Sequence, residues 1–170
     1  MLEIAVVDSP VGGLAVAAHD GRVCALAFGG LTEASAVVKR WFPDEPLVRH
    51  EDPAGTVSAL ARYFCGDLGS LDALPVKLHG TPFQQRVWQQ LRTISAGRTA
   101  SYAEIARAIG APAAVRAVGA ANGSNPVALI IPCHRIIGSD GRLTGYGGGL
   151  DRKRWLLDHE SRSRRLVFPT

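Results

Sequence analysis

Short apolar runs separated by turn residues occupy the first 28 positions and predict three strands. The runs cover 2–7, 14–18 and 22–28, and the turn residues between them include Asp20-Gly21. Because Asp-Gly between two strand-like runs favours a tight hairpin, we expect an antiparallel meander.

Two amphipathic segments follow and predict helices. Thr32 is a candidate cap for a helix that ends near Trp41, and Thr56 for one that ends near Phe64. In the second segment four apolar residues recur at helical spacing, namely Val57, Leu60, Ala61 and Phe64. They predict one apolar face that packs on the sheet.

Stronger helix-start signals occur in the second half of the chain. Thr81-Pro82 with Gln84 combines a cap, a proline at the first helical position and a capping-box partner. Ser101 with Glu104 forms a second capping box. Each signal predicts the first turn of a helix.

A helix-turn-helix pattern follows the second capping box. A short helix, a break at 110–112 and a helix over 113–121 make up the pattern, with Val115 and Val118 expected inward and Arg116 outward. The second helix is rich in Ala and Gly, which would let its backbone approach a nucleic acid closely. A plain helical hairpin is the alternative.

The last predicted helix covers 151–159 and delivers Glu160. Its Lys153 and Arg154 are expected to point outward, and the basic tail 161–170 is expected to be frayed.

Together the elements predict an α+β fold with two domains. Residues 1–78 would form an N-terminal α/β domain with a small antiparallel sheet, and residues 79–170 a helical domain of helix-turn-helix or winged-helix type. Segment 71–79, which contains Pro75, is interpreted as the linker.

Composition is that of an ordinary soluble globular protein. Of the 170 residues, 46% are hydrophobic and 20% charged, so disorder is not expected. The net charge of +4 is compatible with a polyanionic partner. No apolar stretch reaches the ~18 residues of a membrane helix and no signal peptide is recognisable, so we expect no membrane partner and a cytoplasmic location.

The number and spacing of the cysteines also predict a cytoplasmic location. Cys24, Cys65 and Cys133 are odd in number and far apart, which argues against a disulfide framework and for a reducing compartment. Cys24 with His19 or His79 matches no zinc-ligand spacing, so no metal is predicted.

The candidate chemistry lies in 130–137, where Cys133 and His134 are adjacent in an apolar run and Arg135 follows. Thiolate is the reactive form of cysteine, and a neighbouring imidazole or cation lowers the thiol pKa towards neutrality. The pair is therefore a candidate nucleophile with its base. A core strand that contains a buried cysteine is the alternative.

Residues 144–149, Thr-Gly-Tyr-Gly-Gly-Gly, are too rich in glycine for a helix or a regular strand. Because glycine lets a backbone approach another group closely, a ligand-facing loop is predicted, with a flexible linker as the alternative. The Lys-Ser/Thr ending of a phosphate-binding loop is absent.

These motifs together resemble the O6-alkylguanine-DNA alkyltransferases. The sequence Ile-Pro-Cys-His-Arg over 131–135 follows Arg-Ala-Val-Gly over 116–119 and Asn125-Pro126, and it precedes the glycine loop and Leu-Leu-Asp-His-Glu over 156–160. The resemblance runs from about Thr81 to Glu160. The first half resembles the family's ribonuclease H-like domain more loosely.

The resemblance implies a single-turnover methylated-DNA–protein-cysteine methyltransferase that needs no cofactor. It would move an alkyl group from O6 of guanine in duplex DNA, and less efficiently from O4 of methylated thymine, onto Cys133. His134 and Glu160 would form a hydrogen-bonded relay through a water. Tyr102, helped by Lys153, would donate to the guanine so that a neutral base departs.

The implied partner is double-stranded DNA, bound through the minor groove by a monomer, with cooperative binding left open. Arg116 would take the place of the flipped nucleotide. Asn125 would also brace the turn before Cys133. The DNA contacts implied besides Arg116 come from Ala117, Ala121, Asn122, Asn125 and Arg135. The implied substrate pocket includes Tyr146, Gly147 and Gly148.

The chain departs from some members of the family at two places. Asn122-Gly123 stands where some carry a bulkier or cationic pair, and Gly147 where some carry Ser. Fewer phosphate contacts and one missing substrate hydrogen bond could follow. The residues that hold zinc in some members do not line up.

Two other classes of protein compete with this reading. One is a relative that binds alkylated DNA without transfer, or a helix-turn-helix regulator, but Cys133 is present. The other is a cysteine hydrolase that uses Cys133, His134 and Glu160. In the hydrolases, however, nucleophile and base come from distant parts of the chain.

Overall fold

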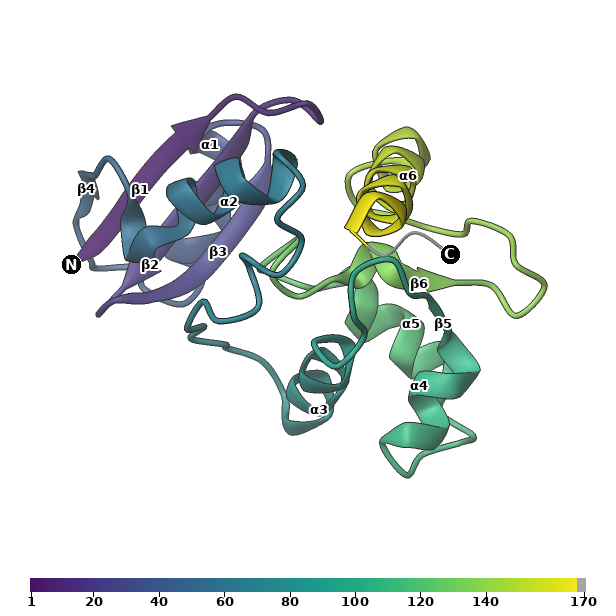
Figure 1. Cartoon of the computed structure of the whole chain (residues 1–170). Coiled ribbons are helices and arrows are strands. Elements are labelled where there is room, and N and C mark those ends of the chain that lie inside the picture. Colours follow the sequence, from purple (N-terminus) through teal and green to yellow (C-terminus); the bar gives the residue numbers. More distant parts are fainter. Residues whose placement is uncertain (168–170) are drawn as a thin grey trace. The chain divides into compact units, whose positions relative to one another are not determined.

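The computed structural model describes residues 1–167 and divides the chain into two compact units (Figure 1). Unit 1 comprises Met1–His79 with Pro126–Ile130, and unit 2 comprises Gly80–Asn125 with the chain from Ile131 onward. The chain therefore leaves unit 2 after Asn125, contributes five residues to unit 1, and returns just before Cys133. A boundary between separately folding domains at residue 78 stays a prediction.

The sheet of unit 1 contains the expected meander. Strands β1 (Leu2–Val7), β2 (Leu14–His19) and β3 (Arg22–Phe28) pair antiparallel in sequence order. A fourth strand, β4 (Leu47–Arg49), pairs parallel to β1 at the edge. Sequence reasoning missed β4 because three residues are too few to show a period.

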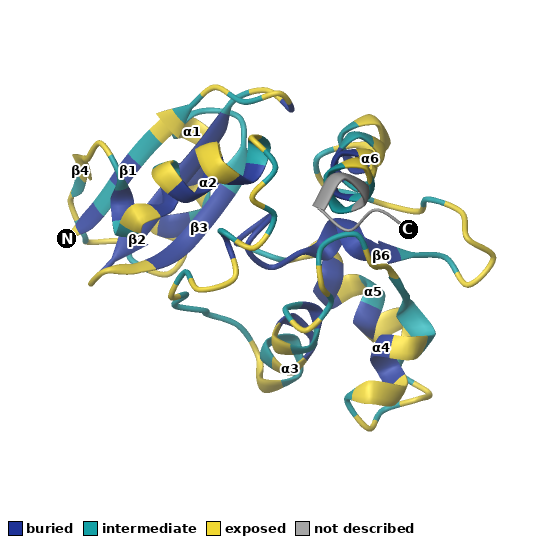
Figure 2. Cartoon of the chain, in the orientation of Figure 1, coloured by how far each residue is buried: buried dark blue, intermediate teal, exposed yellow. Residues whose placement is uncertain are grey.

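Helices α1 (Leu31–Lys39) and α2 (Thr56–Phe64) cover opposite faces of this sheet (Figure 1). Every residue of the central strand β2 is buried as a result (Figure 2). The side chains of Leu2, Ile4 and Ala17 pack with those of Ala34 and Val38 of α1 in a hydrophobic core.

Both N-terminal helices start differently from the prediction. Gly30, not Thr32, is the N-cap of α1, and its N–H donates to the Glu33 carboxylate at 2.7 Å. The α2 cap is supplied by Asp52, whose Oδ1 accepts from Val57 N at 2.6 Å. The carboxylate outcompetes the Thr56 hydroxyl, which is buried without a hydrogen-bond partner among the described residues.

The buried face of α2 also differs from the prediction. Its buried residues are Thr56, Ala59, Leu60 and Tyr63, whereas Ala61 is exposed. A 3-10 turn over Pro53–Gly55, in which Ala54 and Gly55 have positive φ, sets the angle at which the helix enters. The turn before α2 therefore decides which face of the helix is buried, and the spacing of apolar residues within the helix gives no information about that turn.

Segment 71–79 is more than a linker. Val76 pairs with Val23 of β3, with Val23 N donating to Pro75 O and Lys77 N to Val23 O, both at 2.8 Å. The returning segment pairs with β3 as well, through a bridge between Leu26 and Val127.

Unit 2 is built on three packed helices, α3 (Pro82–Leu91), α4 (Tyr102–Ala108) and α5 (Val115–Gly123). Both predicted capping boxes are present, and α4 and α5 form the predicted helix-turn-helix, with α5 two residues later at each end than the expected 113–121. Val118 is buried as expected, but Val115 is 37% exposed because it starts the helix. Short strands β5 (Ala100–Ser101) and β6 (Ile136–Ile137) pair parallel beside these helices.

The last helix, α6, runs over Leu150–Val167 and so continues eight residues beyond the expected end at His159. The expectation of a frayed tail is therefore wrong up to Val167, and 168–170 lie outside the described residues. Within the described part of the chain, no helix is long and apolar enough to cross a membrane.

The Asp52 cap makes a prediction about stability. Asp52→Ala removes the acceptor for Val57 N, Ser58 N and the Ser58 hydroxyl, and should lower the free energy of unfolding by about 1 kcal/mol. Urea unfolding measures the change. The control is Asp44→Ala, an exposed carboxylate outside any helix, which should change stability by less than about 0.5 kcal/mol; equal effects of the two substitutions would contradict the cap.

Candidate active site

Cys133 opens a short turn rather than lying in a strand. A 3-10 turn covers Cys133–Arg135 and leads directly into β6. Before the turn, Asn125 Nδ2 donates to Ile131 O at 2.8 Å, which ties the end of α5 to the residues entering the turn. This contact is of the kind that the bracing role expected of Asn125 requires, and the role itself stays a prediction.

The thiol of Cys133 is nearly inaccessible, with 6% of the residue exposed. Burial raises its pKa, against the stabilising hydrogen bond from the Asn125 amide, the charge of Lys153 and nearby backbone N–H groups. The expectation of a pKa lowered towards neutrality is therefore wrong, because desolvation outweighs the neighbours. Cys133 rests as a thiol at neutral pH and needs a base.

The buried carboxylate of Glu160 lies beside that base. Glu160 Oε1 is 2.7 Å from His134 Nε2 and accepts from Arg135 Nη2 at 2.8 Å, while Oε2 accepts from Arg135 Nε at 3.0 Å and from Gly97 N at 3.4 Å. Burial opposes the ionisation of Glu160, but His134 and Arg135 outweigh it and hold the pKa of the carboxyl well below its usual range.

The ionised carboxylate determines the state of the imidazole. His134 Nε2 must donate to it, which leaves the lone pair on Nδ1. Nδ1 is buried and has no hydrogen-bond partner among the described residues. Burial lowers the pKa of His134 against the opposing charge of Glu160, and Arg135 and Lys153 lower it further. His134 is therefore a neutral base at pH 7.

Arg135 does not lie where the sequence suggests. A DNA contact was expected, yet Arg135 is 4% exposed and its Nη1 donates to Ile94 O at 2.7 Å while two other nitrogens hold Glu160. The expected DNA contact is replaced by a buried ion pair, because a buried guanidinium needs a carboxylate partner.

Two proton donors converge on one carbonyl oxygen of the glycine loop. Tyr102 Oη donates to Thr144 O at 3.3 Å, and Lys153 Nζ donates to the same oxygen at 2.8 Å and to Gly145 O at 3.4 Å. Lys153 was expected to point outward from α6 but is fully buried, and burial lowers its pKa against the opposing charge of Cys133. The carbonyls of this loop compensate the buried ammonium.

Tyr146, Gly147 and Gly148 are the other loop residues expected to line a substrate pocket, and this role stays a prediction. Burial raises the pKa of Tyr146 well above its usual value, and the charges of Cys133 and Glu160 raise it further, so the phenol is protonated. Gly148 O accepts from Arg152 Nη1 at 3.1 Å. A side chain at Gly147 would meet no atom within 4 Å, so this position faces open space.

The expected DNA contacts on helix α5 include two exposed residues and two buried ones. Arg116 and Ala117 are exposed on its first turn. Ala121 and Asn122 are 2% and 5% exposed, so they are not available as a DNA surface in this structure. Trp88 Nε1 donates to Ala121 O at 2.8 Å, and this packing against α3 accounts for the burial of Ala121.

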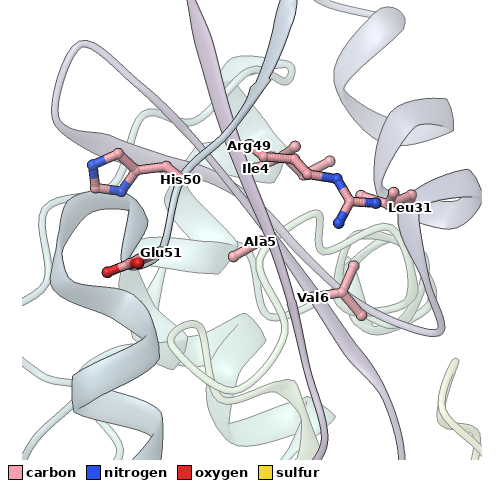
Figure 3. Close-up of a pocket in the computed structure, with 7 residues that line it drawn as sticks. All are labelled: Ile4, Ala5, Val6, Leu31, Arg49, His50 and Glu51. Carbon is pink, nitrogen blue, oxygen red and sulfur yellow. The ribbon is translucent and has the colours of Figure 1, made fainter.

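Two pockets among the described residues lie away from Cys133. One of about 460 Å³ is at the open edge of β1 in unit 1, where Val6, Leu31, Arg49, His50 and Glu51 line it (Figure 3). It contains no cysteine and no buried titratable pair. Another, of about 450 Å³, lies beside β5, β6 and α4 in unit 2. Neither contributes to the chemistry at Cys133.

The remaining cysteines and histidines do not form a second reactive site. Burial raises the pKa of Cys24 to about 11, and Cys65 is an exposed free thiol. His19 lies 2.8 Å from Lys77 Nζ and stacks on Phe42. Among the residues described, no group of three or more His, Cys, Asp or Glu side chains is placed to hold a metal ion.

A buried thiol that precedes a neutral His134 held by Glu160, within a unit that contains a helix-turn-helix, is the arrangement expected of a nucleic-acid-binding protein that uses a cysteine nucleophile. Two family models identify the class further: residues 82–162 match "6-O-methylguanine DNA methyltransferase, DNA binding domain", and residues 3–78 match its "ribonuclease-like domain". The chain belongs to the 6-O-methylguanine DNA methyltransferase family.

Relatives support this assignment along nearly the whole chain. The methylated-DNA–protein-cysteine methyltransferase of Mycobacterium tuberculosis is 48% identical over 160 residues, which is 94% of this chain and 93% of the relative. The protein of the same name from Shigella flexneri is 52% identical over 109 residues, 64% of each chain. A crystal structure of Mycobacterium tuberculosis OGT in complex with DNA superposes with a TM-score of 0.79 and 44% identity, covering 95% of this chain and 94% of that one. The predicted family and fold class are confirmed.

The His134–Glu160 pair makes a prediction about acid stability. Both pKa values are depressed by folding, from ordinary values of 6.5 and 4.5, so the unfolded state binds more protons below each of them. The free energy of unfolding should therefore keep its full value above about pH 6.5 and decrease as the pH falls below that value. A further decrease should follow below about pH 4.5. Urea unfolding between pH 7.5 and 3.5 measures this.

Two variants separate the contribution of Glu160 from the general effect of acid. In Glu160→Gln, the decrease in the free energy of unfolding below pH 4.5 should be smaller than in wild type. Glu3→Gln, which changes a strand residue outside the site, should show the same decrease as wild type. A wild-type stability that does not change between pH 7.5 and 4 would contradict the assigned ionisation states.

Proposed function

We propose that the protein repairs DNA by direct reversal, transferring the alkyl group of O6-alkylguanine in a duplex irreversibly to Cys133. The observation that carries the proposal is the arrangement around the thiol. A neutral His134 held by Glu160 can accept its proton, and Tyr102 and Lys153 lie together on Thr144 O as donors for the leaving base. Each side chain belongs to unit 2.

In the proposed reaction, His134 is the proton acceptor and Tyr102 the proton donor. His134 Nδ1 takes the thiol proton, through a water as the family resemblance implies. The sulfur then attacks the alkyl carbon, so that an S–C bond forms while the C–O6 bond breaks. Tyr102 gives a proton to the departing guanine, and the Lys153 ammonium stabilises the resulting phenolate. A thioether has no route back, so each molecule acts once.

The DNA partner is supported by the matched DNA-binding domain and by the relative whose structure contains DNA. We infer that α5 enters the minor groove, since several of its exposed residues are small, namely Ala117, Ala120 and Gly123. Arg116 would fill the space of the flipped nucleotide, at an unstacking cost of a few kcal/mol. O4-methylthymine is the expected poorer substrate. We further propose a monomer in the cytoplasm, where the exposed thiol of Cys65 would stay reduced.

A mass measurement tests the transfer. Incubating the protein with a duplex that contains O6-methylguanine should add one methyl group per molecule, mapped to Cys133, and Cys133→Ser should gain none. Cys65→Ser is the matched control and should be methylated normally, because Cys65 is exposed and lies in unit 1. A lesion-bound but unmodified protein would instead favour a binding module without transfer.

The role of Arg116 has its own test. Arg116→Ala should slow repair in duplex DNA about a hundredfold while changing reaction with free O6-methylguanine base less than about twofold, because only the duplex requires flipping. Arg107→Ala, which removes an exposed arginine from α4, controls for the loss of one charge. Equal losses on duplex and free base would remove Arg116 from this role.

A further inference from the structure

Arg135 is the one charged residue of the active-site turn to which the proposed mechanism gives no task. It is buried, and its guanidinium makes hydrogen bonds to both oxygens of Glu160 and to Ile94 O. A bidentate Arg–carboxylate contact fixes orientation as well as charge. Ile94 in the connection after α3 therefore anchors Arg135, and Arg135 anchors Glu160.

We propose that Arg135 is a positioning residue: it holds the Glu160 carboxylate in place and balances its charge, so that His134 stays neutral and can accept the thiol proton. The inference rests on the proposed function for the use of that proton, but the arrangement of Arg135, Glu160 and His134 depends only on their charges. Without Arg135, the buried carboxylate would face the imidazole without the two hydrogen bonds that the guanidinium donates to its oxygens. Such an anion favours an imidazolium, which has no lone pair to offer.

Arg135 is the cation in direct contact with the carboxylate that faces His134. The charged and titratable groups near the imidazole include Cys133 and Arg135 on its own turn, and Glu160 and Lys153 on α6. Arg164, also on α6, donates to Gly97 O at 3.4 Å, and Gly97 N in turn donates to Glu160. Tyr146 of the glycine loop interacts with Cys133 and Glu160. Lys153 Nζ is hydrogen-bonded to loop carbonyls, so among the hydrogen bonds described for Glu160 the charged donor is Arg135.

The test compares four variants in a Cys65→Ser background, which removes the exposed competing thiol. Arg135→Gln removes the charge, Arg135→Lys keeps the charge without the bidentate fork, Glu160→Gln removes the partner, and the fourth combines Arg135→Gln with Glu160→Gln. Melting curves define a temperature at which each variant is folded. Because the double variant buries no unpaired charge, it stays informative if Arg135→Gln alone does not fold.

Two readouts report on His134 and Cys133 without DNA. Nitrogen NMR of the His134 ring gives its protonation and tautomer, and the rate of Cys133 alkylation by iodoacetamide is followed from pH 5 to 9 by mass spectrometry. Wild type should show a neutral ring with the proton on Nε2 at pH 7. Arg135→Gln should move the acid limb of the rate profile up by about one pH unit, as loss of a nearby cation does. Arg135→Lys should leave that limb in place and slow the reaction about tenfold.

The combined variant decides whether Arg135 acts through Glu160. It should react no more slowly than Glu160→Gln alone, because nothing is left for the guanidinium to position. If the losses in rate of the two single variants multiply in the combined variant, the proposal is overturned. A folded Arg135→Gln variant whose acid limb and ring spectrum match those of wild type would also overturn it. A loss confined to duplex affinity and its salt dependence would make Arg135 a DNA contact instead. If wild type transfers no methyl group but the NMR and iodoacetamide results hold, the proposed function fails and this inference stands.

Discussion

The buried carboxylate of Glu160 joins separate parts of unit 2. A buried anion is tolerated only when donors surround it, and here they come from two separate parts of the chain, Gly97 after α3 and the 3-10 turn with His134 and Arg135, while α6 carries the accepting Glu160. Satisfying one charge therefore joins the last helix to the active-site turn and to the first connection of the unit. The position of Cys133 follows, because it is the residue before His134.

A second buried charge organises the other side of the site. The ammonium of Lys153 needs acceptors, and the backbone of the glycine loop provides them at Thr144 and Gly145. Gly145 and Gly149 have positive φ, a conformation that glycine adopts without strain, and this lets the loop turn its carbonyls toward α6. Since Tyr102 reaches the same carbonyl, the loop brings α4 and α6 to one point. Two donors that are 51 positions apart thus become neighbours.

The raised pKa of Cys133 suits a cysteine that is used once. A thiolate that existed permanently would react with oxidants and electrophiles, whereas a buried thiol becomes nucleophilic only when its proton can move to His134. The exposed Cys65 has no such protection and no such partner. Burial, which raises the pKa of Cys133, therefore preserves the nucleophile until a substrate binds.

The sequence by itself determined the local structure and the chemistry that is available. Turn residues and apolar periodicity were enough for the meander, both capping boxes and the helix-turn-helix, because these depend on neighbours within a few positions. The motif around Cys133 likewise identified the family. Tertiary structure alone decided the rotation of α2, the burial of Lys153, Ala121 and Asn122, and the place of Arg135. Each depends on which distant group compensates a buried charge or covers a face, and contacts such as that from Arg135 to Ile94 join residues 41 positions apart. A local pattern contains no information about such partners.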